Sequence, residues 1–170
     1  MFEIGDYIVY GNNGVCKVDG IGKVNLSGLQ KDRLYYTLIP IYSKGSKVFT
    51  PTNSDKVVMR HVISKEDALK LIDNINDIET LWVEDGKKRE EAYKQSMRKC
   101  DCKECIRIVK TLYLRKRTLL AAGKKVTVSD EKYLHMAGES LFGELAIPLG
   151  MEKEKIENVI MEKVQFLANA

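Results

Sequence analysis

The sequence has no long apolar run, and its 170 residues include only two histidines, three prolines, four cysteines and one tryptophan. Because no stretch approaches the roughly 18–20 apolar residues that cross a bilayer, we expect no transmembrane helix and no membrane partner. The first residues lack a basic segment followed by an apolar one, so no secretory signal is expected. The protein is therefore predicted to be cytoplasmic, where its cysteines remain reduced.

Motifs that carry catalysis are also scarce. No glycine-rich phosphate loop with a lysine is present. Residues 138–143 miss the spacing of a nucleophile elbow by one residue, and their surroundings have helical periodicity. His61 and His135 fall in different predicted domains, and neither has a partner at a defined spacing. We predict that the protein is not an enzyme and needs no cofactor.

Three of the cysteines lie within six residues. Cys100, Cys102 and Cys105 could contribute thiolates to a zinc site, with Cys16 as a remote fourth ligand. However, Cys100 and Cys102 would point about 200° apart on a helix, and the chain has no second CxxC pair. We interpret these cysteines as small turn or core residues and predict no metal site. Redox sensitivity through Cys102 and Cys105 remains a second interpretation.

Residues 1–63 have the pattern of a small β domain. Short apolar runs at residues 7–10, 34–42, 47–50 and 57–60 alternate with turns rich in glycine, asparagine and serine. Gly20 and Gly22 indicate a bent or bulged strand over residues 15–22. Four or five strands of this kind predict a Tudor- or SH3-like β-barrel.

From Ser64 onward the apolar period changes to that of helices. Five helices are predicted over residues 64–170, which gives an α+β chain with its domain boundary near residue 63. The first begins with a cap at Ser64 and ends near residues 74–77. The second is expected to carry Ile78, Leu81, Trp82 and Tyr93, and a cap at Ser129 is expected to begin the fourth. The inward-facing apolar residues expected are Ala68, Leu69, Leu71, Ile72, Ile106, Val109, Leu112, Tyr113, Leu119, Leu120, Leu134, Ala137, Leu141, Leu145, Ile156, Val159, Ile160, Val164 and Leu167.

The charge is distributed unevenly along this helical region. Residues 64–86 carry 2 basic and 7 acidic side chains, residues 87–125 carry 14 and 4, and residues 126–170 carry 4 and 8. The central block therefore has a net charge of +10 between two acidic segments. Such a block is typical of a surface that meets phosphates or an acidic protein, although a solvated helical face gives the same pattern.

The single tryptophan, Trp82, lies where the charge changes sign. It is either a core anchor of the helical domain or an exposed ring that inserts between bases. On a continuous helix Trp82, Arg89 and Tyr93 would share one face. We predict an exposed indole, because Lys87, Lys88 and Arg89 follow a few residues later and would hold it against a phosphate backbone.

Several motifs, taken in order, resemble the CarD-like (CarD/CdnL) family of bacterial transcription regulators. The resemblance covers nearly the whole chain and includes the opening FxIGDxIVYxxxG and the VFTP strand end, then Trp82 with Arg89 downstream. Further along it includes LYxRK, GKK, SDEK and LFGELA, which begin at Leu112, Gly123, Ser129 and Leu141. The resemblance implies a Tudor-like domain that binds RNA polymerase and a helical domain that binds promoter DNA at the upstream edge of the transcription bubble.

In that family a tryptophan wedges into the minor groove and stabilises the open complex, and Trp82 is the matching residue. The residues expected to bind DNA, largely without sequence preference, are Trp82, Lys87, Lys88, Arg89, Arg115, Lys116, Arg117, Lys124 and, from the resemblance, Lys132. Those expected to bind the polymerase β subunit, by pairing of a strand edge, are Val24, Lys47, Val48, Phe49, Thr50 and Pro51.

We therefore expect a monomeric, nucleoid-associated transcription regulator. The alternative is an adaptor whose helical domain binds an acidic protein and never touches DNA. Salt-dependent binding to promoter DNA distinguishes these two interpretations.

Overall fold

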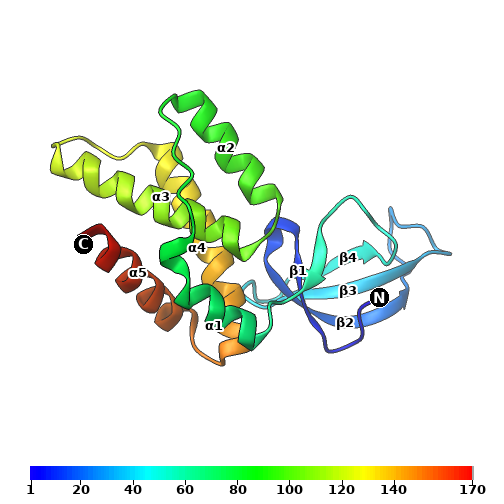
Figure 1. Ribbon diagram of the computed structural model, residues 1–170. Helices are drawn as coiled ribbons and strands as arrows, with labels where there is room; N and C mark the ends of the chain where they lie inside the picture. The colour runs from blue at the N-terminus through cyan, green and yellow to red at the C-terminus, as the bar shows by residue number, and fades with distance from the viewer. Residues whose placement is uncertain (170) are drawn as a thin grey trace. The chain divides into compact units, whose positions relative to one another are not determined.

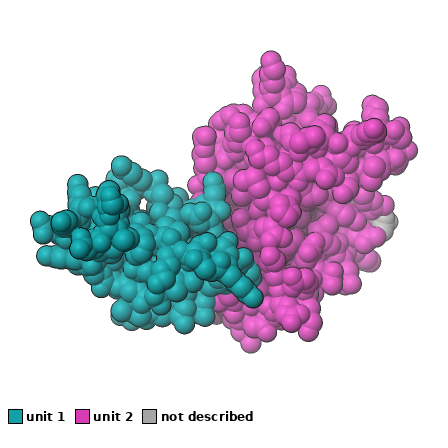
Figure 2. Space-filling view, turned by 180° about the vertical axis from the view of Figure 1, so that it is seen from behind, with its two compact units in different colours: residues 1–62 teal, residues 63–170 magenta. Residues whose placement is uncertain are grey.

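A computed structural model describes the backbone of residues 1–169 and the side chains of residues 1–166. The chain divides into two compact units, one comprising Met1–Val62 and the other beginning at Ile63 (Figure 2). The first unit is a five-stranded antiparallel sheet and the second consists of five α-helices, so the predicted order of a Tudor-like domain and a helical domain is confirmed (Figure 1). Each unit has a hydrophobic core of its own.

The strands of the first unit follow a simple meander with one exception. They are β1 (Tyr7–Tyr10), β2 (Val15–Lys23), β3 (Leu34–Pro40), β4 (Val48–Pro51) and β5 (Met59–His61). Their order across the sheet is β4-β3-β2-β1-β5, so β5 crosses over to pair with β1 and the free edges belong to β4 and β5. The long strand β3 is flanked on both sides, as its length and β-forming composition predict.

Glycine determines the local geometry at two points of this sheet. The connection from β1 to β2 is the 3-10 turn η1 (Gly11–Asn13), and Gly14 then adopts a φ of 74°, which a side chain would strain. In β2 the register to β3 shifts between Val18 and Gly20, which confirms the predicted bulge. The core beneath the sheet is formed by Ile8, Tyr10, Cys16, Val18, Tyr36 and Leu38.

The helices of the second unit are α1 (Lys65–Asp73), α2 (Gly86–Arg98), α3 (Cys102–Ala121), α4 (Val128–Leu149) and α5 (Lys153–Asn169), with the 3-10 turn η2 (Ile75–Asp77) after α1. Side chains cap four of them at the N-terminus. The oxygen of Ser64, Asp85, Asp101 or Thr127 accepts a hydrogen bond from an amide of the first turn. The predicted cap at Ser64 is thus confirmed, whereas the cap of α4 is Thr127, two residues before the expected Ser129.

The predicted start of the second helix is wrong. Residues 78–85 are not helical, and α2 begins only at Gly86 because the Asp85 carboxylate accepts hydrogen bonds from the amides of Lys87 and Lys88. Trp82 therefore does not share a helical face with Arg89 and Tyr93. Gly86 is the first residue of α2.

The core of the second unit gathers residues from every helix and contains most of the predicted apolar stripes. Leu69 and Leu120 are exceptions, because both side chains are largely exposed. Leu167 lies outside the side chains that the structure describes. The last turn of α4 includes Pro148, and Gly150 follows as a left-handed cap with a φ of 59°.

Candidate nucleic-acid interface

Trp82 lies in a non-helical segment between η2 and α2. Leu81 packs partly against the core and Val83 is half-buried, while 54% of the intervening Trp82 surface is exposed. The prediction of an exposed indole is confirmed, and the indole lies in a non-helical segment and not on the predicted helix.

Side chains of α3 bind the backbone of this segment. The ammonium of Lys110 donates hydrogen bonds to the carbonyls of Ile75, Asn76 and Ile78 at 3.1, 3.2 and 2.7 Å. Because Lys110 is buried, desolvation lowers its pKa, and the charge of Asp77 partly opposes that shift. An ammonium is suited to this position because it has three donors and no acceptor, so each donor can satisfy one carbonyl.

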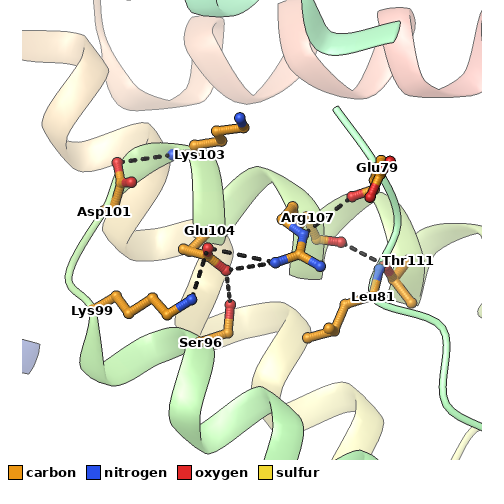
Figure 3. Close-up of polar contacts among 9 residues, drawn as sticks. All are labelled: Glu79, Leu81, Ser96, Lys99, Asp101, Lys103, Glu104, Arg107 and Thr111. Carbon is orange, nitrogen blue, oxygen red and sulfur yellow. Dashed lines mark hydrogen bonds and ion pairs between the residues drawn. The ribbon is translucent and has the colours of Figure 1, made fainter. Parts of the chain in front are cut away.

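Arg107 and Thr111, one helical turn apart on α3, hold the residues just before Trp82 (Figure 3). The Nε of Arg107 donates to the Glu79 carbonyl at 3.3 Å, and the Oγ1 of Thr111 accepts from the Leu81 amide at 2.7 Å. Figure 1 shows the segment running beside α3 before it enters α2. Its path is thus set by polar contacts to its backbone as well as by the packing of Leu81.

Glu104 orients Arg107 from the same helix. Its carboxylate receives hydrogen bonds from Ser96 at 2.6 Å and Lys99 at 3.2 Å, and pairs with Arg107 at 3.1 Å (Figure 3). Burial opposes ionisation, but these hydrogen bonds and the charges of Arg107 and Lys99 outweigh it and lower the pKa of Glu104. Glu104 therefore remains charged and joins the C-terminal end of α2 to α3.

Two of the expected phosphate-binding arginines are instead directed into the helical unit. Arg89 is buried and lies 3.6 Å from the Asp130 carboxylate, and its Nη1 also donates to the Glu84 carbonyl at 3.2 Å. Arg115 donates to the other oxygen of Asp130 at 2.7 Å. The carboxylate of Asp130 is 4% exposed, so it joins α2, α3 and α4 from the interior. The prediction that Arg89 faces DNA is corrected, because a buried guanidinium paired with Asp130 is not on the surface.

The remaining expected cations are more accessible. Lys87 and Lys88 are exposed in the first turn of α2, five and six residues after Trp82. Arg117, Lys124 and Lys132 are also exposed, and Lys132 lies 5.4 Å from the ring centre of Tyr133. Lys116 is half-exposed and forms an ion pair with Glu131 at 3.6 Å. Some cations of the basic block are therefore exposed at the surface, and others form ion pairs with acidic side chains of the same unit.

Five of the six residues expected to bind polymerase lie on β4 or directly before it, and the sixth, Val24, follows β2. Thr50 is buried, Val48, Phe49 and Pro51 are half-buried, Lys47 is exposed, and half-buried Val24 follows the end of β2. The Thr52 amide donates to the Leu34 carbonyl, so this pair is hydrogen-bonded. Because hydrogen-bonded pairs alternate along an antiparallel ladder, the backbone groups of Phe49 and Pro51 point away from β3.

Three of the four cysteines are buried. Cys102 and Cys105 are buried in the helical core, where the Cys102 thiol donates to the Glu144 carboxylate at 2.9 Å. Cys16 is buried in the sheet unit, and burial raises its pKa to about 11. His61 packs its ring edge-on against Phe2 at 4.9 Å. Across the described residues no group of three or more His, Cys, Asp or Glu side chains is placed to hold a metal ion.

Two family models match the chain, one in each unit. The model of the CarD-like/TRCF RID domain matches residues 2–63, and the model of the CarD C-terminal domain matches residues 70–161. The first therefore spans the five-stranded sheet, and the second contains Trp82, the α3 side chains that hold its segment and the Asp130 pair. None of the helices within the described residues is both long enough and apolar enough to cross a membrane.

Proposed function

Because the chain belongs to the CarD-like family of RNA polymerase-interacting transcription factors, we propose that it ties the polymerase to promoter DNA and stabilises the open complex. The family is of a non-enzymatic kind. In this proposal the sheet unit binds the polymerase β subunit, and the helical unit binds DNA at the upstream edge of the transcription bubble. The protein acts there as a monomer and does not depend on a particular promoter sequence.

The exposed indole of Trp82 is the observation that carries this proposal. A large aromatic ring, 54% exposed on a segment whose backbone is held on both sides, has the form of a wedge. Inserting a wedge into the minor groove costs a few kcal/mol, because bases are unstacked, and this cost is offset because the distorted duplex contacts more of the protein. Such a contact reads the deformability of DNA and requires no pattern of base hydrogen bonds.

The first turn of α2 supplies a nearby phosphate-binding surface. Exposed Lys87 and Lys88 lie at the N-terminal end of this helix, where the helix dipole also favours an anion. The carboxylates of Glu84 and Asp85 lie directly before these lysines and reduce this positive potential. Lys124 and Lys132 are further candidates, whereas Arg89 and Arg115 act indirectly by maintaining the fold around Asp130.

Binding to a forked duplex that imitates the upstream edge of the bubble tests the DNA contact. Trp82→Ala should weaken binding and shorten the lifetime of open complexes on two unrelated promoters, while the far-UV circular dichroism stays unchanged. Phe166→Ala is the matched control, because Phe166 is an exposed aromatic residue on α5 of the same unit. Equal binding by Trp82→Ala and the wild type would refute the wedge.

Salt dependence tests the phosphate contacts separately. Each phosphate contact that is lost should reduce the slope of log K against log salt by about 0.9. We expect this change for Lys87→Ala and for Lys88→Ala, and no change for Lys155→Ala, which removes an exposed lysine from α5. If no lysine variant changes the slope of log K against log salt for DNA binding, the result favours an acidic protein as the partner of this surface.

The free edge of β4 is the proposed contact with the β subunit. Phe49 directs both its N–H and its C=O outward, whereas Pro51 has no N–H and directs only a carbonyl outward. Within β4, Phe49 is therefore the one residue that could both donate and accept a backbone hydrogen bond with a partner strand. Phe49→Pro should therefore abolish binding to polymerase while Phe49→Ala, which keeps the amide, retains most of it. Equal affinities for the two variants, both shown to be folded, would exclude pairing at this edge.

A further inference from the structure

The last hydrogen bond between α3 and the backbone that precedes Trp82 is made by the hydroxyl group of Thr111. Lys110 and Arg107 hold the segment as far as Glu79, and the Leu81 amide is then bound by Thr111 at 2.7 Å (Figure 3). Leu81 is the residue directly before Trp82. The Thr111 contact is therefore the last one that determines where the indole leaves the surface of the helical unit.

The hydroxyl of Thr111 acts as the acceptor in its hydrogen bond with the Leu81 amide. Thr111 is 1% exposed, and its hydroxyl donates to the carbonyl of Arg107 at 2.6 Å. Its single proton is thus committed to its own helix, and a lone pair faces the Leu81 amide. Neither group can exchange its partner for water without moving the segment away from α3.

A second contact fixes the chain after Trp82. The Nη1 of Arg89 donates to the Glu84 carbonyl at 3.2 Å, and Arg89 itself is held by Asp130. Trp82 and Val83 are the only residues between these two bound positions, so the backbone has little freedom while the indole remains exposed. A segment that is ordered before binding loses less conformational entropy when it meets a partner.

We propose that Thr111 is a positioning residue for Trp82, and that it keeps the indole pre-ordered for insertion into DNA; this inference rests on the function proposed above. Without the hydroxyl, the Leu81 amide loses its partner and the segment leaves α3 for part of the time. Only molecules that hold the segment in place then bind with the original affinity. If this fraction is about one-tenth, the apparent affinity falls about tenfold.

Time-resolved fluorescence tests the first half of this proposal without DNA. Trp82 is the only tryptophan, so its anisotropy decay reports the mobility of this segment. Thr111→Val, which keeps the shape and removes the hydroxyl, should increase the fast depolarisation of the indole, and Thr111→Ser should restore the wild-type decay. If Thr111→Val does not fold, Thr111→Cys keeps a weak acceptor and should give an intermediate increase.

Thr118 provides the matched control. It lies on the same helix and is exposed, and its hydroxyl donates to the carbonyl of Leu114, four residues back on that helix, at 3.1 Å. Thr118→Val should leave the anisotropy decay unchanged. The proposal is overturned if Thr111→Val and Thr118→Val both match the wild type.

A double-mutant cycle with Trp82→Ala tests the second half. Thr111→Val should weaken binding to the forked duplex about tenfold in the wild type and have no further effect when Trp82 is already alanine. Additive losses would mean that Thr111 acts elsewhere, and would overturn the proposal. If Trp82→Ala alone leaves DNA binding unchanged while Thr111→Val still loosens the indole, the wedge fails and the positioning of Trp82 by Thr111 stands.

Discussion

Asp130 is the residue whose loss should damage the helical unit most through electrostatics. Its carboxylate is 4% exposed and neutralises part of the charge of two arginines, with one oxygen 2.7 Å from Arg115 and the other 3.6 Å from Arg89. Asp130→Asn keeps the size of the side chain but leaves both guanidinium groups without their anion. Removing one partner of a buried pair typically costs about 3–5 kcal/mol. Because Arg115 is partly exposed and screened by water, we expect about 3 kcal/mol, the lower end of that range.

Thermal unfolding followed by circular dichroism measures this loss. For a domain of about this size each kcal/mol lowers Tm by roughly 4–8 °C, so Asp130→Asn should reduce Tm by at least about 12 °C. Glu131→Gln is the control, since Glu131 pairs with Lys116 at the surface and should contribute under about 1 kcal/mol. The effect at Asp130 should persist in about 0.5 M salt, because buried pairs are poorly screened.

A triple variant separates charge from packing. Arg89→Met, Arg115→Met and Asp130→Leu together remove every charge of the network and retain comparable volume. Since the cost of the single change arises from uncompensated charge, the triple variant should recover most of the lost stability. The reasoning is refuted if Asp130→Asn costs less than about 1 kcal/mol, the level of an exposed pair, or if the triple variant is as unstable as the single one.

Four further outcomes are expected. The Tyr93 hydroxyl is buried and has no hydrogen-bond partner among the described residues, so Tyr93→Phe should be neutral or stabilising at neutral pH in denaturant titrations. Burial and the charge of Asp130 raise the pKa of Tyr93 to about 12 from 10.0, so the stability of the wild type relative to Tyr93→Phe should fall as pH rises from about 10 to about 12. Lys110→Met should destabilise the helical unit by about 1.5–3 kcal/mol for each charged hydrogen bond that water does not replace, as measured by chemical unfolding. Thiol labelling of the native protein should modify half-buried Cys100 faster than Cys16, whose burial raises its pKa to about 11, and equal rates would contradict this order.

The sheet unit was predictable because its signals are local. Glycines at positions 11 and 14 give positive φ values, and they mark the turn between β1 and β2 in the sequence itself. The bulge in β2 likewise follows from Gly20, which interrupts the strand pattern. Pairing of β5 with β1 depends on distant contacts, so the sequence indicates a fifth strand but not its neighbour.

The segment around Trp82 was not predictable from periodicity. Apolar Ile78 and Leu81 have helical spacing to Trp82, yet their backbone is bound by Thr111 and other polar side chains of α3 that lie about 30 residues further along. A local signal was nevertheless present. Asp85 before Gly86 is a cap that begins a new helix, and giving it more weight than the apolar spacing would have placed the start of α2 correctly.

Charge counting had a similar limit. The basic block from residue 87 to 125 predicts a surface of strong positive potential, but a count cannot separate Lys87 on the surface from Lys110 and Arg89 in the interior. Separating them needs the partners of the buried cations, such as Asp130 on another helix. The accessible positive charge is consequently smaller than the net value of +10 for this block.

A modest number of exposed cations is sufficient if the polymerase contact comes first. Sequence-independent binding to DNA has a dissociation constant of about 10⁻⁴–10⁻⁶ M at physiological salt, which is weak for a protein free in solution. Two binding units in one chain convert the second contact into an intramolecular one, at an effective concentration on the order of 1 mM. Even at the weak end of that range the DNA site would be about 90% occupied. Separating the units should therefore abolish the effect at promoters even though each unit keeps its own affinity, and mixing the separated units should not restore it.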